Sequence, residues 1–350
     1  MDNQIKQQIK DGAMIPAIPL ALDNNRKWDE RRQRAVLRYY FDAGVGGVGI
    51  GVHTTQFEIR KPEIGLFQPV LELGIEEIIR AEKRLNRTLL RVAGICGKTS
   101  QAVSEAKLIS EMGYHAGLLN VSAMNGESID SIVEHCRLVA EVIPVFGFYL
   151  QTAVGGVLLP YEFWRRFAEI ENVAAIKMAP FNRYQTFDVV RAVIESGRED
   201  IALYTGNDDN IVIDMLAPYR IKTANGIVER RITGALLGHY AVWTKKSAEI
   251  FEKCKNEALK DSVSSEMLIL ANEVTDTNAV FYDAANNFAG CRAGLHEVLR
   301  RQGIFENTFC LDSNETLGAG QIEEIHRVYK AYPHLNDDDF VAQHLDEWLS

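Results

Sequence analysis

The sequence lacks the features that define several classes of protein. It contains no run of about 18 uncharged apolar residues, so we expect no membrane-spanning helix. Its 38 Lys and Arg are outnumbered by 48 Asp and Glu, and the net charge is −10. The basic residues are scattered along the chain rather than gathered in one block. Because contact with phosphate backbones requires a positive surface, nucleic acid is an unfavourable partner.

Cysteine is scarce and does not occur in close pairs. The five cysteines are an odd number without a CxxC pair: Cys96, Cys136, Cys254, Cys291 and Cys310. This pattern argues against a disulfide framework and against a zinc site. The first residues also lack an apolar stretch between a basic head and a cleavage site. We therefore expect a cytoplasmic protein that holds neither a metal nor a cofactor.

The sequence does contain a repeated alternation of strand and helix patterns. With 350 residues, of which 47% are hydrophobic and 25% charged, the chain can bury one large core and an appendage. Up to about residue 230, short runs rich in Val, Ile and Leu alternate with segments of helical period. The predicted strands are 14–22, 47–52, 89–95, 116–122, 144–150, 173–179, 201–206 and 222–228.

These strand and helix units predict a closed (β/α)₈ TIM barrel over residues 1–240. Strands that are covered inside by other strands and outside by helices have apolar sequences throughout, as here. An open, doubly wound sheet is the alternative. Beyond Arg231 the alternation stops, and helical patterns cover 232–258, 262–273, 278–302, 319–331 and 337–349. We expect residues 241–350 to form a helical layer packed on the barrel.

Lys177 is the most unusual residue near a predicted strand end, where a barrel of this type has its active site. The segment Val173-Ala-Ala-Ile-Lys-Met-Ala179 places an ammonium group in an otherwise apolar strand. Burial would lower the pKa of this amine and free it to attack a carbonyl carbon. Alternatively, the lysine reaches solvent or pairs with a carboxylate.

Other polar residues are expected near the same strand ends. Tyr149, in the neighbouring strand, could pass protons to and from a lysine adduct, or it could pack in the core. His53 is the only histidine near a predicted strand mouth and could contact a substrate. Asp208 and Asp209 follow strand seven, where they could bind a metal, although capping of the next helix is the favoured interpretation.

Several segments between residues 10 and 250 carry a family resemblance. They are Ile15-Pro-Ala-Ile-Pro-Leu-Ala21, Phe41-Asp-Ala-Gly-Val-Gly-Gly-Val-Gly-Ile-Gly51, Tyr149 with Lys177 28 positions later, Ile201-Ala-Leu-Tyr-Thr-Gly-Asn-Asp208 and Gly226-Ile-Val228. In these the chain resembles the dihydrodipicolinate synthase and N-acetylneuraminate lyase family of class I pyruvate-dependent aldolases. The resemblance implies that Lys177 forms a Schiff base, that Tyr149 moves protons and that Gly206 and Ile227 contact the substrate. It also implies a homo-oligomer, either a tetramer or a dimer.

The chain departs from the pattern of this family in the loop after strand two. Where the family has Gly-Thr-Thr-Gly-Glu, which holds the carboxylate, this chain reads Gly51-Val-His-Thr-Thr-Gln-Phe-Glu58. Either Val52 and His53 or Thr54 and Thr55 take the places of the two threonines. Backbone amides can bind a carboxylate in both registers. A hydroxyl relay to the tyrosine is expected only in the second register.

Two further departures concern the synthase branch of the family. That branch has a second tyrosine in the loop after strand four, and an arginine five residues after the strand-five tyrosine. The corresponding stretch here is Ser122-Ala-Met-Asn125, and Val154 stands at the place of the arginine. Without this arginine a second substrate carboxylate loses its partner, so we expect a reaction other than dihydrodipicolinate synthesis.

Together these features predict a lyase or aldolase that forms a Schiff base with pyruvate or another 2-oxo acid. Lys177 and Tyr149 are the predicted catalytic residues, and His53, Thr54, Thr55, Gly206 and Ile227 are the predicted substrate-binding residues. Apolar residues near the mouth, including Met178 and Phe181, suggest a less polar acceptor pocket than that of the synthases. The alternatives are a dehydratase of 2-oxo sugar acids, a metal-dependent lyase and a non-catalytic sensor of 2-oxo acids.

Overall fold

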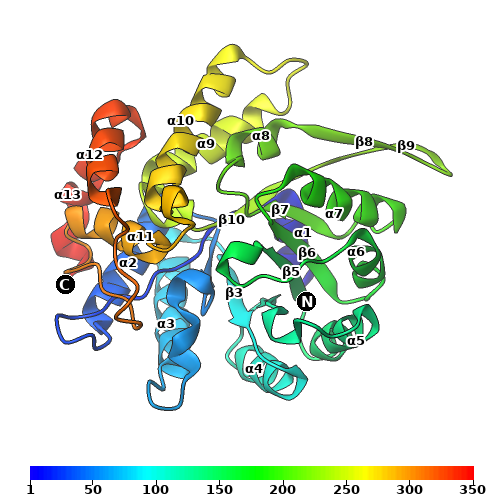
Figure 1. The fold of residues 1–350 in the computed structure, drawn as a ribbon, viewed down its shortest axis with the longest axis horizontal. Helices are drawn as coiled ribbons and strands as arrows, with labels where there is room; N and C mark the ends of the chain where they lie inside the picture. The colour runs from blue at the N-terminus through cyan, green and yellow to red at the C-terminus, as the bar shows by residue number, and fades with distance from the viewer.

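The computed structural model describes residues 1–350 and contains an eight-stranded parallel barrel (Figure 1). The barrel strands are β1 (Met14–Pro16), β2 (Gly47–Ile50), β3 (Leu90–Ile95), β4 (Ala116–Leu119), β5 (Val145–Leu150), β6 (Val173–Ala179), β7 (Ala202–Thr205) and β10 (Gly234–Leu237). They pair in the order β1-β10-β7-β6-β5-β4-β3-β2. The ring closes between β1 and β2, where the Ile18 amide donates to the Gly49 carbonyl at 2.9 Å. The predicted (β/α)₈ barrel is therefore confirmed.

The eighth barrel strand differs from the prediction. Residues 222–228 belong to an antiparallel hairpin of β8 (Pro218–Thr223) and β9 (Gly226–Arg231), which projects from the barrel in Figure 1. Ile227 lies on β9 with 75% of its surface exposed, so its predicted contact with substrate is wrong. The strand that closes the barrel, β10, is only four residues long and lies inside the segment predicted as a helix over 232–258.

Helices form the outer layer of the barrel. The ring consists of α2 (Glu30–Ala43), α3 (Phe67–Leu85), α4 (Thr99–Glu111), α5 (Ile129–Ala140), α6 (Tyr161–Phe167), α7 (Arg183–Glu195), α8 (Ile211–Leu216) and α9 (Thr244–Glu257). Local signals set their ends. The α2 helix begins where the Asp29 carboxylate accepts the Arg32 amide, and it ends at Gly44, whose φ of 103° suits glycine. The α1 helix (Asn3–Asp11) inserts Ile5 and Ile9 into the apolar cluster inside the barrel.

The hydrophobic core has two parts, separated by the wall of strands. Alternate residues of β5 belong to different parts, as the two-residue period of a strand requires. Phe146, Phe148 and Leu150 point into the barrel. Val145 and Tyr149 belong to the layer between strands and helices. This alternation decides which residues of β5 can reach a site inside the barrel.

The C-terminal residues are helical and pack beside the barrel. The predicted boundary at residue 240 falls just before α9, which packs against α2 and α8 as a ring helix. The helices that follow are α10 (Ser265–Phe281), α11 (Cys291–Arg301), α12 (Gln321–Ala331) and α13 (Asp338–Trp348). The helix predicted over 278–302 is broken between α10 and α11, where Asp283, Asn287 and Phe288 have positive φ. The break carries three residues of this segment to the strand ends, as described below.

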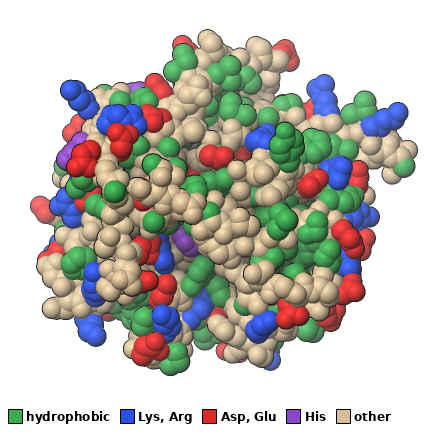
Figure 2. All heavy atoms as spheres, viewed as in Figure 1, with side chains coloured by type: hydrophobic (Ala, Val, Ile, Leu, Met, Phe, Trp, Pro, Cys, Tyr) green, Lys and Arg blue, Asp and Glu red, His purple; other side chains and the backbone are tan.

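No helix combines the length and the apolar character needed to cross a membrane. On the face seen in Figure 2, Lys and Arg side chains are interspersed with Asp and Glu, without a large basic patch.

Candidate active site

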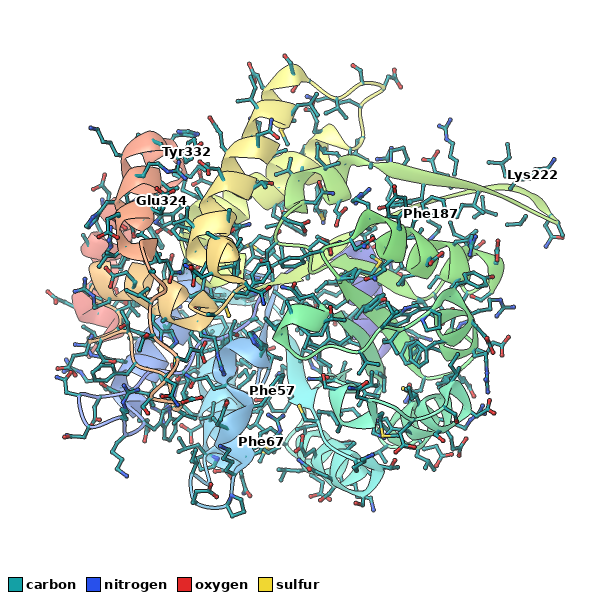
Figure 3. All side chains as sticks on the ribbon, in the orientation of Figure 1. Phe57, Phe67, Phe187, Lys222, Glu324 and Tyr332 are labelled. Carbon is teal, nitrogen blue, oxygen red and sulfur yellow. The ribbon has the colours of Figure 1, made fainter.

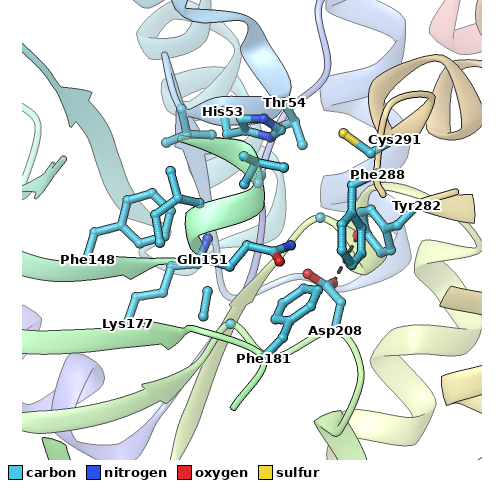
Figure 4. Close-up of a pocket in the computed structure, with 17 residues that line it drawn as sticks. His53, Thr54, Phe148, Gln151, Lys177, Phe181, Asp208, Tyr282, Phe288 and Cys291 are labelled. Carbon is cyan, nitrogen blue, oxygen red and sulfur yellow. Dashed lines mark hydrogen bonds between the residues drawn. The ribbon is translucent and has the colours of Figure 1, made fainter. Parts of the chain in front are cut away.

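A pocket opens at the C-terminal ends of the barrel strands, where the sequence places the active site (Figure 4). Together with the solvent space at its open mouth, it contains about 550 Å³. It is lined by Ala17, Val52, His53, Thr54, Phe148, Leu150, Gln151, Val154, Lys177, Ala179, Phe181, Gly206, Asp208, Gly238, Tyr282, Phe288 and Cys291. The pocket brings together Lys177, His53, Thr54 and Gly206 from the prediction and leaves out Tyr149, Thr55 and Ile227.

Lys177 presents its amine to this pocket from β6. The side chain is 7% exposed, and its Nζ lies 4.3 Å from the centroid of the Phe148 ring on the paired residue of β5. No hydrogen bond or ion pair engages Nζ. Burial lowers the pKa of the Lys177 amine to about 8, and the carboxylate of Asp208 opposes this shift. At pH 7 about a tenth of the amine is therefore neutral and nucleophilic, far more than for a lysine with an ordinary pKa.

Gly206 allows the lysine side chain to cross the end of β7. A Cβ atom at residue 206 would lie 2.6 Å from Cε of Lys177 and 2.8 Å from Cβ of Ala179. Neither approach is tolerated without movement, so only glycine fits beneath the extended lysine. Gly206 thus lines the pocket and lies against the Lys177 side chain, while its contact with a substrate stays a prediction.

The geometry contradicts the predicted role of Tyr149. Its side chain is 1% exposed in the outer layer, with its ring 5.3 Å from that of Trp164. The hydroxyl accepts a hydrogen bond from the Leu159 amide at 3.3 Å. The inward position beside Lys177 is occupied by Phe148, which has no hydroxyl. Because successive residues of a strand face opposite ways, an offset of one residue removes the phenol from the site.

The loop after β2 forms one wall of the pocket through a short 3₁₀ turn, η1 (His53–Thr55). Thr55 is fully buried beneath this turn, where its hydroxyl donates to the Ile18 carbonyl at 2.7 Å and accepts from the Gly51 amide at 3.1 Å. The Thr54 hydroxyl donates to the same carbonyl at 3.2 Å. The amides of His53 and Thr54 have no acceptor within the protein. The loop therefore offers backbone donors, while both threonine hydroxyls serve to hold its shape.

His53 contributes a neutral imidazole to the same wall. Burial lowers the pKa of His53 to about 3, and the positive charges of Arg292 and Lys177 act in the same direction. The ring packs edge-on against Phe57 at 5.9 Å. At neutral pH this histidine can accept or donate one hydrogen bond, but it does not contribute positive charge.

Asp208 lies in the pocket, across from Lys177, rather than at a helix cap. Its Oδ1 accepts from the Tyr282 hydroxyl at 2.9 Å and from the His239 amide at 3.1 Å, while Oδ2 has no donor. Burial raises the pKa of Asp208 to about 6, although the His239 amide and the charge of Lys177 oppose the shift. The favoured interpretation from sequence, a cap, is wrong for this residue because α8 has Asn210 at its N-cap position.

The segment between α10 and α11 completes the pocket with residues that the sequence interpretation missed. Tyr282 donates to Asp208, and the Phe288 ring packs edge-on against Phe181 at 5.8 Å. Burial raises the pKa of the Cys291 thiol to about 12, so this cysteine is a poor nucleophile. Although His53, Asp208 and Cys291 line one pocket, no three such side chains gather closely enough to hold a metal ion.

Sequence comparisons relate part of the chain to known proteins. No protein-family model matches it. It is 27% identical over 154 residues to 4-hydroxy-tetrahydrodipicolinate synthase of Sulfurihydrogenibium sp. (strain YO3AOP1), a match that covers 42% of the chain and 51% of that protein. It is 30% identical over 133 residues to the protein of the same name from Acetivibrio thermocellus, covering 37% and 43%. The chain thus spans about half the length of the curated relatives that it matches.

Solved structures share the fold over nearly the whole chain. Dihydrodipicolinate synthase from Oceanobacillus iheyensis superposes with a TM-score of 0.73 at 15% identity, covering 94% of this chain and 99% of that one. N-acetylneuraminate lyase from Fusobacterium nucleatum gives a TM-score of 0.70 at 16% identity, covering 92% and 98%. The chain is therefore similar in sequence to these synthases over part of its length, and it shares its barrel fold with dihydrodipicolinate synthases and N-acetylneuraminate lyases of known structure.

Proposed function

We propose that the protein is a lyase or aldolase of class I type, in which Lys177 forms a Schiff base with pyruvate or another 2-oxo acid. One observation carries the proposal: the Lys177 amine is buried at the strand ends, has no hydrogen-bond partner and has a pKa of about 8. An amine in this state is a nucleophile for a ketone carbon. The synthases and lyases that resemble the chain in sequence or fold add independent support.

The proposed site for the substrate carboxylate is the loop after β2. The free amides of His53 and Thr54 are suitable donors for an anion, because their partial positive charge is not neutralised by a protein acceptor. Lys177 is the only cationic residue that lines the pocket. It must react through its neutral form, so the backbone carries the recognition of the carboxylate.

The reaction begins when the lone pair of Nζ adds to C2 of the 2-oxo acid. The carbinolamine takes a proton from solvent and releases its hydroxyl as water, which leaves an iminium. Loss of a proton from C3 gives an enamine, and C3 then attacks the carbonyl carbon of an aldehyde, whose oxygen takes a proton. Water hydrolyses the iminium and restores the free lysine. Cleavage of an aldol follows the reverse order.

Asp208 is the proposed carrier of the proton, in place of the tyrosine that faces away. Its Oδ2 is free of protein donors, and its pKa of about 6 lies near neutrality, where a group can both accept and return a proton. Tyr282 and the His239 amide fix the carboxylate through Oδ1. Val154 lines the pocket at the place expected for an arginine, which supports a reaction other than dihydrodipicolinate synthesis.

A sensor that binds a 2-oxo acid without turnover is the second candidate. The observation that favours it is Phe148, which places a hydrocarbon ring beside Lys177 where the family resemblance implies a phenol. A dehydratase would use the same enamine as the aldolase, so the two differ only in the product.

We also propose that the protein is a homo-oligomer, either a tetramer or a dimer. Light scattering after gel filtration tests this proposal directly, and a monomer at all concentrations would contradict it.

Exchange of the pyruvate methyl protons in D₂O, followed by ¹H NMR, tests the enzymatic proposal. Enamine formation removes a C3 proton, so wild-type protein is expected to replace methyl protons with deuterium. Lys177→Ala is expected to abolish the exchange, whereas Tyr149→Phe serves as the matched control and is expected to retain it. Binding of pyruvate without exchange would favour the sensor. Neither binding nor exchange with a panel of 2-oxo acids would contradict both candidates.

A further inference from the structure

Two phenylalanines form the side of the pocket that lies away from the loop after β2 (Figure 4). Phe181 follows β6, and Phe288 comes from the break between α10 and α11. Their rings are 5.8 Å apart at an interplanar angle of 73°, and both are only partly buried. The two rings also line a second cavity of about 320 Å³, which shares Asp208 and Tyr282 with the first. The ring pair is thus a wall between two adjoining spaces.

Both phenylalanines have a backbone conformation that bulky residues avoid. Phe181 has φ of 51° and Phe288 has φ of 66°. The left-handed region is unfavourable for an L-residue because its Cβ atom crowds the following carbonyl oxygen. Hydrogen bonds hold each one there: the Phe181 amide donates to Oδ1 of Asn207 at 3.1 Å, and the Phe288 amide donates to the Asp283 carbonyl at 3.0 Å. Residues with such strained backbone conformations are concentrated at ligand sites, where the strain is retained because it places the side chain for binding.

The remaining groups on this side of the pocket do not suit a charged or heavily hydroxylated acceptor. Asp208 is acidic, and apart from Lys177 no cation lines the pocket, so a second substrate carboxylate would lack a partner and meet a like charge. Gln151 supplies one uncharged amide, which points into the pocket in Figure 4. Leu150 and Val154 add apolar surface. Aromatic rings pack edge-on or offset against one another, and such pairs are more stable than their buried area alone accounts for.

We propose that the acceptor is an uncharged aromatic aldehyde whose ring packs against Phe181 and Phe288. This inference rests on the proposed Schiff-base function and names its substrate class. The aldehyde carbon bonds to C3 of the Lys177 enamine, and the aldehyde oxygen takes a proton from Oδ2 of Asp208. Hydrolysis of the iminium then releases a 4-aryl-4-hydroxy-2-oxo acid, and no oxidant or other co-reactant is consumed.

Product formation from pyruvate and three aldehydes tests the inference. Benzaldehyde, glyceraldehyde and succinic semialdehyde represent an aromatic, a hydroxylated and an anionic acceptor, and products are measured by chromatography with mass spectrometry. We expect kcat/KM for benzaldehyde to exceed that for either other aldehyde by at least about tenfold. Equal rates for the three, or a preference for glyceraldehyde or succinic semialdehyde, would overturn the inference.

Variants of the ring pair make the test specific to these residues. Phe288→Leu keeps apolar bulk and removes the ring, and it is expected to raise KM for benzaldehyde about two- to tenfold, with a smaller effect on KM for pyruvate. Phe181→Asn provides a second variant, since asparagine tolerates a positive φ. Phe187→Ala is the matched control, because Phe187 lies on the outside of α7 (Figure 3). Unchanged KM for benzaldehyde in both folded variants would contradict the inference.

The inference and the proposed function can fail separately. Reduction with borohydride in the presence of pyruvate traps the Schiff base without any acceptor. If wild-type protein forms no adduct, the Schiff-base function itself is wrong. If the adduct forms on Lys177 but aromatic aldehydes are not preferred, only the acceptor class is wrong.

Discussion

Replacing Lys177 with methionine is expected to stabilise the protein at neutral pH while it abolishes the chemistry. The ammonium group is buried without a hydrogen-bond partner, and burial lowers its pKa from an ordinary value of 10.5 to about 8. At 1.36 kcal/mol per pKa unit, this difference corresponds to about 3 kcal/mol of destabilisation while the lysine is charged. Methionine fills a similar volume without a charge. The charge of Lys177 also stabilises the buried Asp208 carboxylate, so its removal raises the pKa of Asp208 further and destabilises that carboxylate. The net gain in stability of Lys177→Met is therefore at most about 3 kcal/mol.

The sign of the pH dependence follows from the same two pKa values. Below about pH 8 the lysine is charged in both the folded and the unfolded states, and the full penalty applies. As pH rises from about 8 to 10.5, the folded lysine loses its proton while the unfolded lysine keeps it. The unfolded state then binds more protons, so the stability of the wild type rises relative to that of the variant. The advantage of Lys177→Met therefore shrinks across this pH range.

Urea unfolding of both proteins at pH 7 and at pH 10, in reducing buffer, measures the effect. Lys222→Met is the matched control, because Lys222 is exposed on the hairpin (Figure 3), and it is expected to change the free energy of unfolding by less than about 0.5 kcal/mol. The reasoning is refuted if Lys177→Met is no more stable than the wild type at pH 7, or if its advantage is the same at both pH values.

Three further substitutions separate the roles of neighbouring groups. Asp208→Asn is expected to slow methyl-proton exchange about 10²–10³-fold. Because the charge of Asp208 raises the pKa of Lys177, the same variant is expected to move the midpoint of adduct formation below pH 8. An unchanged exchange rate would show that Asp208 takes no part in the mechanism. Tyr149→Phe is expected to leave the exchange rate within about twofold, because the hydroxyl faces away from the pocket. It is expected to lower the free energy of unfolding in urea by about 1–3 kcal/mol, because the buried Leu159 amide loses its acceptor. A large kinetic loss would restore the catalytic role of Tyr149. Gly206→Ala is expected to displace the Lys177 side chain and to reduce the yield of the reduced pyruvyl adduct at least about tenfold, as measured by quantitative mass spectrometry. A native circular dichroism spectrum shows that the variant is folded. A wild-type yield of adduct would refute the packing argument.

Much of the barrel was predictable because strands that are buried on both faces have continuous apolar sequences. The predicted 173–179 coincides with β6, and Lys177 stood out as the one charge within it. The eighth strand was not predictable in the same way. The hairpin over 218–231 has enough Ile and Val to resemble a barrel strand, and β10 is too short to be distinguished from the start of a helix.

The active site was predicted less completely, for two physical reasons. Spacing along the chain does not determine which face of a strand a residue occupies, and the pairing of β5 with β6 shifts register between Val145 and Phe146. A separation of 28 residues therefore matched Tyr149 to Lys177, although Phe148 is its partner. In addition, Tyr282 and Phe288 reach the pocket only through tertiary packing. The Asn-Asn pair and the glycine in Asp283-Ala-Ala-Asn-Asn-Phe-Ala-Gly290 were the one local sign of a break there.

Intact-protein mass spectrometry after incubation with pyruvate and borohydride tests the central claim most directly. For the wild type we expect the mass of one reduced pyruvyl group per chain, located on Lys177 by peptide mapping and absent from Lys177→Ala. The yield is expected to rise with pH through about 8, as the amine loses its proton. Absence of an adduct with pyruvate and with longer 2-oxo acids, or an adduct on another lysine, would contradict the account.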